Sequence, residues 1–157
     1  MQDRGERAKA LFYEGYNCAQ AVFCAFDDIT GFDRETAARL ASSFGGGMGR
    51  LREVCGAVSG ALLVLGSVGG YAEPNDPEAK KVHYALVQEF ARRFREKNGS
   101  IVCRELLSGL GVSEGGAPEA RTEEFYKKRP CPELIADAAR IADALLAECR
   151  RTVNGEQ

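Results

Sequence analysis

The sequence lacks the short motifs by which most small metal and redox proteins are recognised. It contains no CxxC pair and no CxxCH motif, so a thioredoxin-type site, an attached haem and the common zinc knuckles have no support. His83 is the only histidine, which argues against a His-rich metal site. Strand patterns are nearly absent, and no run reaches the roughly 18 apolar residues that a membrane span needs.

The overall charge and composition are those of an ordinary globular domain. The 157 residues carry a formal net charge of -2, whereas a nucleic-acid-binding domain usually presents a basic face. Hydrophobic residues make up 45% of a chain that is long enough to bury a core. The stretch MQDRGERAKALF has charges of both signs and no apolar segment of signal-peptide type. We therefore predict one cytoplasmic domain over residues 1–157, with no nucleic-acid partner and no membrane span.

Apolar residues recur at helical spacing through most of the chain. This periodicity predicts an all-α, single-domain bundle of roughly six to eight helices. Residues 109–121 are rich in glycine and are predicted to form a loop, and residues 152–157 a frayed tail. In the first half of the chain, helices are predicted at 4–14, at 18–26 with Asn17 as the cap, after the cap Asp33, and from about Glu53. In the second half, helices are predicted from Pro77 to about Lys97 with Asp76 as the cap, from the cap Ser100 to Leu107, and from Pro132. A helical turn or two is also predicted within 119–128.

Six cysteines are informative in a chain predicted to be cytoplasmic. Reducing compartments keep thiols free, so cysteines there more often bind metal or carry redox or catalytic chemistry than form structural disulfides. Four of the six are predicted in the first turn of four separate helices, where unpaired N–H groups and the helix dipole favour a thiolate. A thiolate is the form that attacks disulfides and binds metal. These four cysteines are Cys18, Cys55, Cys103 and Cys131.

Basic residues flank three of these four cysteines and would further favour the thiolate. The neighbours are Arg50 and Arg52 for Cys55, Arg104 for Cys103, and Lys128 and Arg129 for Cys131.

The remaining candidates are better explained by packing. Free cysteine often behaves as a small buried hydrophobe, and inert burial is also open for each of the four helix-terminal thiols. Cys24 falls on another helix face among apolar residues, and Cys149 lies near the C-terminus of the last helix, where the dipole disfavours a thiolate. We predict a core or incidental surface position for both. His83 is predicted to be a partly exposed helix residue rather than half of a Cys–His pair.

The glycines at 45–49 have two interpretations. A glycine-rich stretch before a helix can cradle a phosphate with backbone N–H groups, but no GK[ST] follows and no strand precedes it. Alternatively, the glycines allow positive φ and close packing where Cys55 meets another helix. We favour the second interpretation.

Two segments resemble the C-GCAxxG-C-C family, redox-active proteins named for their cysteines. They are GYNCAQAV at 15–22 and FGGGMGRLREVCGAVSGAL at 44–62, with a CGAxxG element at 55–60. The resemblance covers about residues 5 to 145 and identifies Cys18, Cys55, Cys103 and Cys131 with the family's four cysteines, leaving Cys24 and Cys149 as extras. The family is also similar to a domain of split-Soret cytochromes. The haem does not carry over without CxxCH, whereas an iron–sulfur cluster is compatible with the cysteines.

The leading hypothesis is a small redox protein whose four thiols converge, with Cys18 and Cys55 close enough to share a bond or a ligand. The thiols would hold an Fe–S cluster or another thiophilic metal such as zinc, or cycle between dithiol and disulfide with an unidentified redox partner. The second version would be an enzyme of the thiol–disulfide oxidoreductase type, and sequence cannot choose its connectivity.

The alternative from another class is a helical binding or assembly module with purely structural cysteines, which would scatter the four sulfurs through separate parts of the core. A helical thiol peroxidase is a further alternative, but such proteins usually carry a CxxC pair. Apolar helix surface is compatible with a homodimer.

Overall fold

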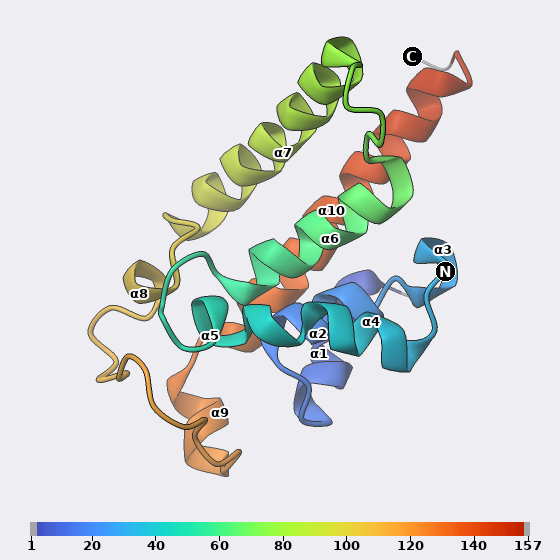
Figure 1. Ribbon diagram of the computed structural model, residues 1–157. Helices are drawn as coiled ribbons and strands as arrows, with labels where there is room; N and C mark the ends of the chain where they lie inside the picture. The colour runs from blue at the N-terminus through green and yellow to red at the C-terminus, as the bar shows by residue number, and fades with distance from the viewer. Residues whose placement is uncertain (1–2, 156–157) are drawn as a thin grey trace.

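The computed structural model describes residues 3–155 as a bundle of helices (Figure 1). Helices α6 and α10 lie side by side, α1 and α2 pack against their lower ends with α4 beyond α2, and α7 packs against α10 and α6. Among residues 3–155, seven α-helices are longer than one turn, within the predicted range. They are α1 (Arg4–Tyr13), α2 (Cys18–Cys24), α4 (Arg34–Ala41), α6 (Gly56–Gly69), α7 (Pro77–Asn98), α9 (Glu123–Lys128) and α10 (Cys131–Val153).

Shorter segments connect these helices. They are α3 (Asp27–Thr30), the 3-10 helix η1 (Ser42–Phe44), α5 (Gly45–Met48) and α8 (Cys103–Leu106). Residues 3–155 form no strand beyond an isolated antiparallel bridge between Val54 and Val102. The predicted all-α fold class is thereby confirmed. Nowhere in this part of the chain is there a helix with both the length and the apolar character needed to cross a bilayer.

The hydrophobic core lies where α1, α2, α6, α7 and α10 meet. Its largest fully buried side chains are aromatic, and burying such rings removes a large apolar area from water. They are Phe12, Phe23, Phe26, Phe90 and Phe94.

Three predicted helix caps form in the structure, each by a side-chain oxygen that accepts a backbone N–H bond. Asn17 accepts from Gln20 at 2.9 Å, Asp33 from Thr36 at 2.7 Å, and Asp76 from Ala79 at 3.0 Å. The Gln20 side chain in turn accepts a hydrogen bond from the Asn17 N–H at 3.0 Å, which completes a capping box at the start of α2.

Two predicted helix starts are wrong. Helix α6 begins at Gly56 rather than near Glu53, because Arg50 and Arg52 adopt positive φ and Val54 pairs with Val102. Cys55 is therefore the N-cap residue of α6 instead of a first-turn residue.

Helix α8 begins at Cys103, with Val102 and not Ser100 as its N-cap. The Ser100 hydroxyl accepts the Val102 N–H at 2.9 Å and so closes a turn ahead of the helix. The same bridge to Val54 holds this segment extended.

Two predicted helix ends also shift. Helix α2 ends at Cys24 instead of residue 26. Helix α10 continues to Val153, so residues 152 and 153 of the predicted tail 152–157 are helical, and residues 156–157 lie outside the described residues. Between α8 and α9, residues 109–121 follow an irregular path without helix.

Candidate thiol site

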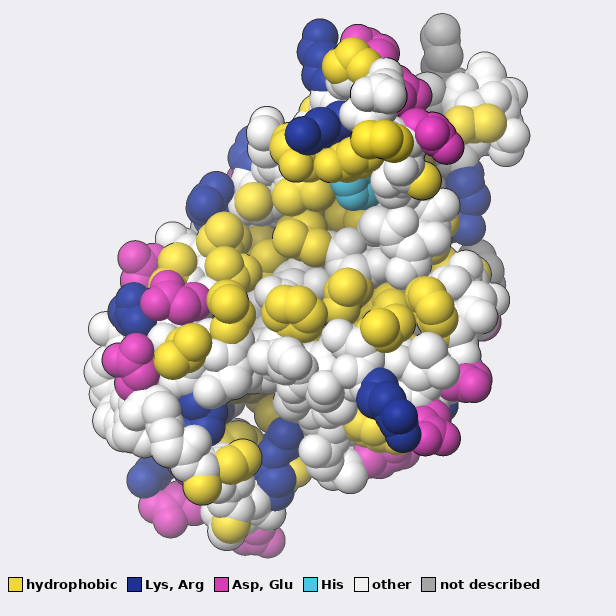
Figure 2. Space-filling view, viewed as in Figure 1, with side chains coloured by type: hydrophobic (Ala, Val, Ile, Leu, Met, Phe, Trp, Pro, Cys, Tyr) yellow, Lys and Arg dark blue, Asp and Glu magenta, His cyan; other side chains and the backbone are white. Residues whose placement is uncertain are grey.

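One cavity of about 290 Å³ has all four helix-terminal cysteines in its walls. It lies at the lower end of the bundle, where α2, α6, α8 and α10 begin (Figure 1). Figure 2 shows basic side chains at the edge of a hollow near α9 on this part of the surface. The four cysteines that line this cavity are the four predicted at helix starts, Cys18, Cys55, Cys103 and Cys131.

Hydrogen bonds on either side of the Val54–Val102 bridge fix the backbone of two of the cysteines. The N–H of Cys55 donates to the carbonyl of Ile101 at 2.8 Å, and the N–H of Cys103 donates to the carbonyl of Glu53 at 2.6 Å. The starts of α6 and α8 are consequently held together although they lie far apart in the sequence.

Gly47, in the glycine-rich stretch 45–49, and Gly56, at the start of α6, both lie close to these cysteines. A Cβ at Gly47 would lie 2.7 Å from the Cβ of Cys103, and one at Gly56 would lie 3.0 Å from the Cβ of Cys18. Gly47 also has φ +70, which side-chain-bearing residues rarely adopt. Positive φ and close approach are therefore what these glycines supply, as our favoured interpretation predicted.

The thiols of Cys18 and Cys131, on the first residues of α2 and α10, are near enough that each is the largest influence on the pKa of the other. The interaction with Cys131 lowers the pKa of Cys18, and the charges of Arg121 and Arg129 act in the same direction against the effect of burial. The same interaction raises the pKa of Cys131 well above its ordinary value, with burial adding to the effect. Of the two thiols, Cys18 is therefore the one that ionises more readily.

The other two thiols are less ionisable. Burial, together with the charge of the neighbouring Cys18, raises the pKa of Cys55 to about 12. Burial also raises the pKa of Cys103, although the Arg52 guanidinium donates to its sulfur at 3.8 Å and opposes that shift. Cys18 is half-buried whereas the other three cysteines are buried, so Cys18 is both the most ionisable and the most accessible of the four.

The predicted partnership of Cys18 with Cys55 stays a prediction. The two thiols share the cavity, and Cys18 raises the pKa of Cys55, but the largest influence on the pKa of Cys18 comes from Cys131. The spacing of the cysteines in the sequence could not indicate that Cys18 interacts with Cys131, because these two residues lie toward opposite ends of the chain.

The cysteines as placed do not make a ready metal site. In the part of the chain that the structure describes, no three His, Cys, Asp or Glu side chains are close enough to hold one ion. All six cysteines are free thiols. The donor set is chemically suited to a thiophilic metal or an Fe–S cluster, but its present spacing does not fit either.

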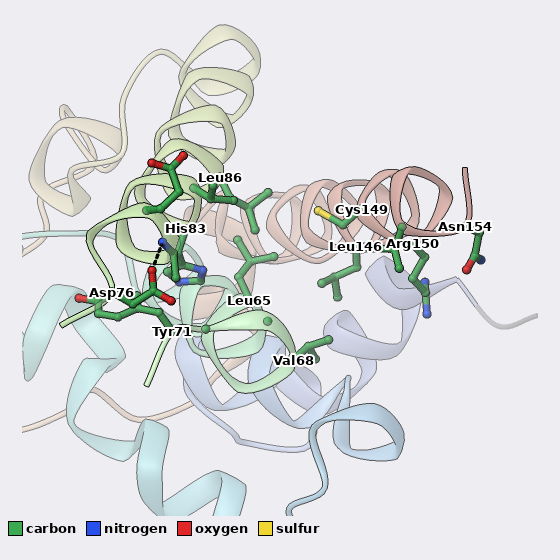
Figure 3. Close-up of a pocket in the computed structure, with 16 residues that line it drawn as sticks. Leu65, Val68, Tyr71, Asp76, His83, Leu86, Leu146, Cys149, Arg150 and Asn154 are labelled. Carbon is green, nitrogen blue, oxygen red and sulfur yellow. Dashed lines mark hydrogen bonds between the residues drawn. The ribbon is translucent and has the colours of Figure 1, made fainter. Parts of the chain in front are cut away.

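The three residues to which the sequence analysis assigned no redox role, Cys24, Cys149 and His83, do not line this cavity. Cys24 is buried in the core, and burial raises its pKa. Cys149 is exposed and lines a second cavity of about 650 Å³ between the ends of α6 and α10 and the start of α7. His83 faces Cys149 across this second cavity (Figure 3), and its partly buried ring has an Nδ1 atom without a hydrogen-bond partner in the described residues.

Sequence analysis missed Arg121. This arginine comes from the irregular loop, donates to the carbonyl oxygens of Phe12 at 3.2 Å and Tyr16 at 3.0 Å, and lies over the Phe12 ring at 4.4 Å. These contacts span more than one hundred residues of sequence, so no local pattern could reveal them. Arg52 was predicted as a neighbour of Cys55, whereas its guanidinium contacts Cys103.

Comparison with known proteins places this site in a family. Neither the curated proteins nor the solved structures contain a match to the chain. A family model described as "Putative redox-active protein (C_GCAxxG_C_C)" matches residues 16–145, a range that contains all four cysteines of the cavity. The chain belongs to this C_GCAxxG_C_C family.

Proposed function

We propose that the protein is a thiol–disulfide oxidoreductase in which Cys18 attacks a substrate disulfide and Cys131 resolves the intermediate. The observation that carries this proposal is that Cys18 and Cys131, at the starts of α2 and α10, line one cavity and act on each other's pKa. Exchange requires a thiolate with access to its target and a second thiol within reach. Cys18, which is partly exposed and has a lowered pKa, is the candidate for the first role, and Cys131 for the second.

The reaction proceeds in two exchanges. The Cys18 thiolate attacks one sulfur of the substrate disulfide, whose S–S bond breaks, and the other sulfur leaves as a thiolate that takes up a proton. Cys131 then loses its proton and attacks the Cys18 sulfur, which releases the second substrate sulfur as a thiol. Two protein thiols are oxidised by two electrons in total, and the substrate disulfide is reduced to two thiols.

Two arginines support the first exchange. The charges of Arg121 and Arg129 favour the Cys18 thiolate and would also stabilise the negative charge on the leaving sulfur. Cys55 has a pKa raised to about 12 and therefore stays protonated during the attack.

The direct test is to map the disulfide formed when the reduced protein meets a small neutral disulfide. The protein is purified anaerobically, analysed for iron, sulfide and zinc, reduced, and treated with 2-hydroxyethyl disulfide before peptide mass mapping. In a C149S background, which removes the exposed thiol, we expect the loss of two thiols and a Cys18–Cys131 link. C18S should abolish this link, C131S should trap a mixed disulfide on Cys18, and C24S should behave like the unaltered protein.

Other outcomes would replace the proposal. Stoichiometric iron and sulfide with visible absorbance would favour a cluster held by rearranged thiols, and one equivalent of zinc would favour a metal site. Thiols that react only after unfolding would favour the module with structural cysteines. A disulfide that forms equally well in C18S would contradict the role of Cys18.

A further inference from the structure

The walls of the cysteine cavity carry an excess of positive charge. Among the residues that line it, four arginines stand against a single carboxylate, Glu119. Two of the arginines share that carboxylate: Arg129 lies 2.6 Å and Arg50 3.7 Å from its oxygens. The other two arginines are Arg52 and Arg121.

Arg52 is a buried cation whose hydrogen bonds are incomplete. Only 4% of its surface is exposed, and its Nε donates to the carbonyl of Ser113 at 3.0 Å. Nη1 faces the sulfur of Cys103 at 3.8 Å, and Nη2 is buried without a partner in the described residues. No carboxylate in residues 3–155 pairs with this guanidinium. A buried donor left without an acceptor destabilises the protein, more so when it is charged, so a bound acceptor would recover that cost.

Arg121 also lines the cavity and is likewise unmatched by an acid. Its hydrogen bonds go to two carbonyls and to the Tyr126 hydroxyl at 3.5 Å, with no carboxylate partner among residues 3–155. Its charge acts on Cys18, whereas Arg52 acts on Cys103. The two unmatched guanidinium groups therefore sit at separate walls of the cavity, near different thiols.

We propose that the cavity binds a low-molecular-weight disulfide bearing carboxylates at both ends, with one carboxylate at Arg52 and the sulfur–sulfur bond at Cys18. This proposal rests on the proposed function and adds the substrate class. Guanidinium groups bind carboxylates through paired hydrogen bonds, and Arg52 has a free nitrogen for such a bond. A volume of about 290 Å³ admits a molecule of that size but not a folded protein segment. The electrons move as in the exchange above, with this disulfide as the oxidant.

The kinetic test compares three small disulfides that differ mainly in end-group charge. They are dithiodipropionate with two carboxylates, 2-hydroxyethyl disulfide with neutral ends, and cystamine with two amines. We expect the reduced protein to be oxidised by dithiodipropionate at least about tenfold faster than by the neutral compound, and by cystamine more slowly than by either. Salt should reduce the preference because it screens the attraction.

Arginine variants assign that preference to the cavity. R52Q and R121Q should each reduce the rate ratio between the dicarboxylate and the neutral disulfide several-fold, and two separate variants guard against a folding defect in one. R92Q is the matched control, because Arg92 lies on the exposed surface of α7 and pairs with Glu89 and Glu96. Its ratio should equal that of the unaltered protein.

A redox-inert probe separates the two proposals. Thiodipropionate, a dicarboxylate thioether, cannot exchange with thiols, and calorimetry should detect its binding to the unaltered protein and to C18S but not to R52Q. Equal rates for the three disulfides together with no thiodipropionate binding would overturn the substrate class and leave the oxidoreductase intact. Thiodipropionate binding without any disulfide exchange would support the anion site and overturn the oxidoreductase.

Discussion

Gly60 in α6 faces the backbone of Ala19 in α2 so closely that a Cβ at residue 60 would lie 2.6 Å from the Ala19 carbonyl oxygen. No side chain separates the two helices at this point. The contact begins one turn earlier at Gly56, whose Cβ position lies 3.0 Å from the Cβ of Cys18. The small residues of the CGAxxG element thus set the distance between the start of α2 and the start of α6, and with it the distance between Cys18 and Cys55.

Gly60→Ala should therefore destabilise the protein. The added methyl group meets backbone atoms that cannot rotate away, and such overpacking typically costs about 1–3 kcal/mol. Urea denaturation followed by circular dichroism measures the change in the free energy of unfolding. Gly66→Ala in the same helix is the control: its Cβ would meet nothing within 4 Å, so removal of a flexible glycine should stabilise by about 0.5–1 kcal/mol. Equal effects of the two changes would refute the close contact.

The sequence was sufficient to predict the three helix caps and the all-α fold class, because both depend on residues that are near one another in the chain. The caps Asn17, Asp33 and Asp76 were found because each side chain bonds to a backbone N–H only three residues ahead. The fold class followed from helical periodicity for the same reason. The gathering of the four cysteines was predicted by combining these helix starts with the family resemblance.

The parts that sequence did not predict depend on contacts between distant segments. Cys55 sits outside its predicted first turn, and α8 begins at Cys103 instead of after Ser100, because Val54 pairs with Val102, forty-eight residues away. Arg50 and Arg52 take positive φ, a conformation that residue type alone does not suggest. The pairing of Cys18 with Cys131 depends on how α2 and α10 pack, which no spacing encodes.

Asn17→Ala should loosen the position of Cys18. The substitution removes the capping bond to Gln20 and the bond from Asn17 to the Ser42 carbonyl at 3.1 Å, so a loss of about 1 kcal/mol in the free energy of unfolding is expected. The alkylation rate of Cys18 should also change. Asp33→Ala removes the cap of α4, which is not part of the cavity wall, and should cost a similar stability without altering Cys18 alkylation. A similar change in Cys18 alkylation in both variants would contradict a local role for the Asn17 cap.

The two extra cysteines should differ sharply in reactivity. Cys149 is exposed, and Cys24 is fully buried with a pKa raised by burial. A disulfide reagent such as DTNB should modify Cys149 rapidly in the folded protein and Cys24 only after unfolding. C149S should remove a rapid phase from the time course, and C24S should leave the native time course unchanged. Rapid labelling of Cys24 in the native protein would show that the α2 face opens far more readily than its packing implies.

The pH dependence of Cys18 alkylation should report the influence of Cys131 on its pKa. Iodoacetamide reacts with the thiolate, so the rate rises with pH through the pKa of the attacking thiol. Because the pKa of Cys18 is lowered, this rise should lie below the value of about 8.5 that an unperturbed thiol shows. C131A removes the donor and should shift the profile upward, whereas C131S keeps a hydroxyl donor and should retain most of the lowering. The identity of the alkylated residue is checked by mass mapping, since Cys149 is also exposed. Coincident profiles for C131A and the unaltered protein would show that the arginine charges alone, and not Cys131, activate Cys18.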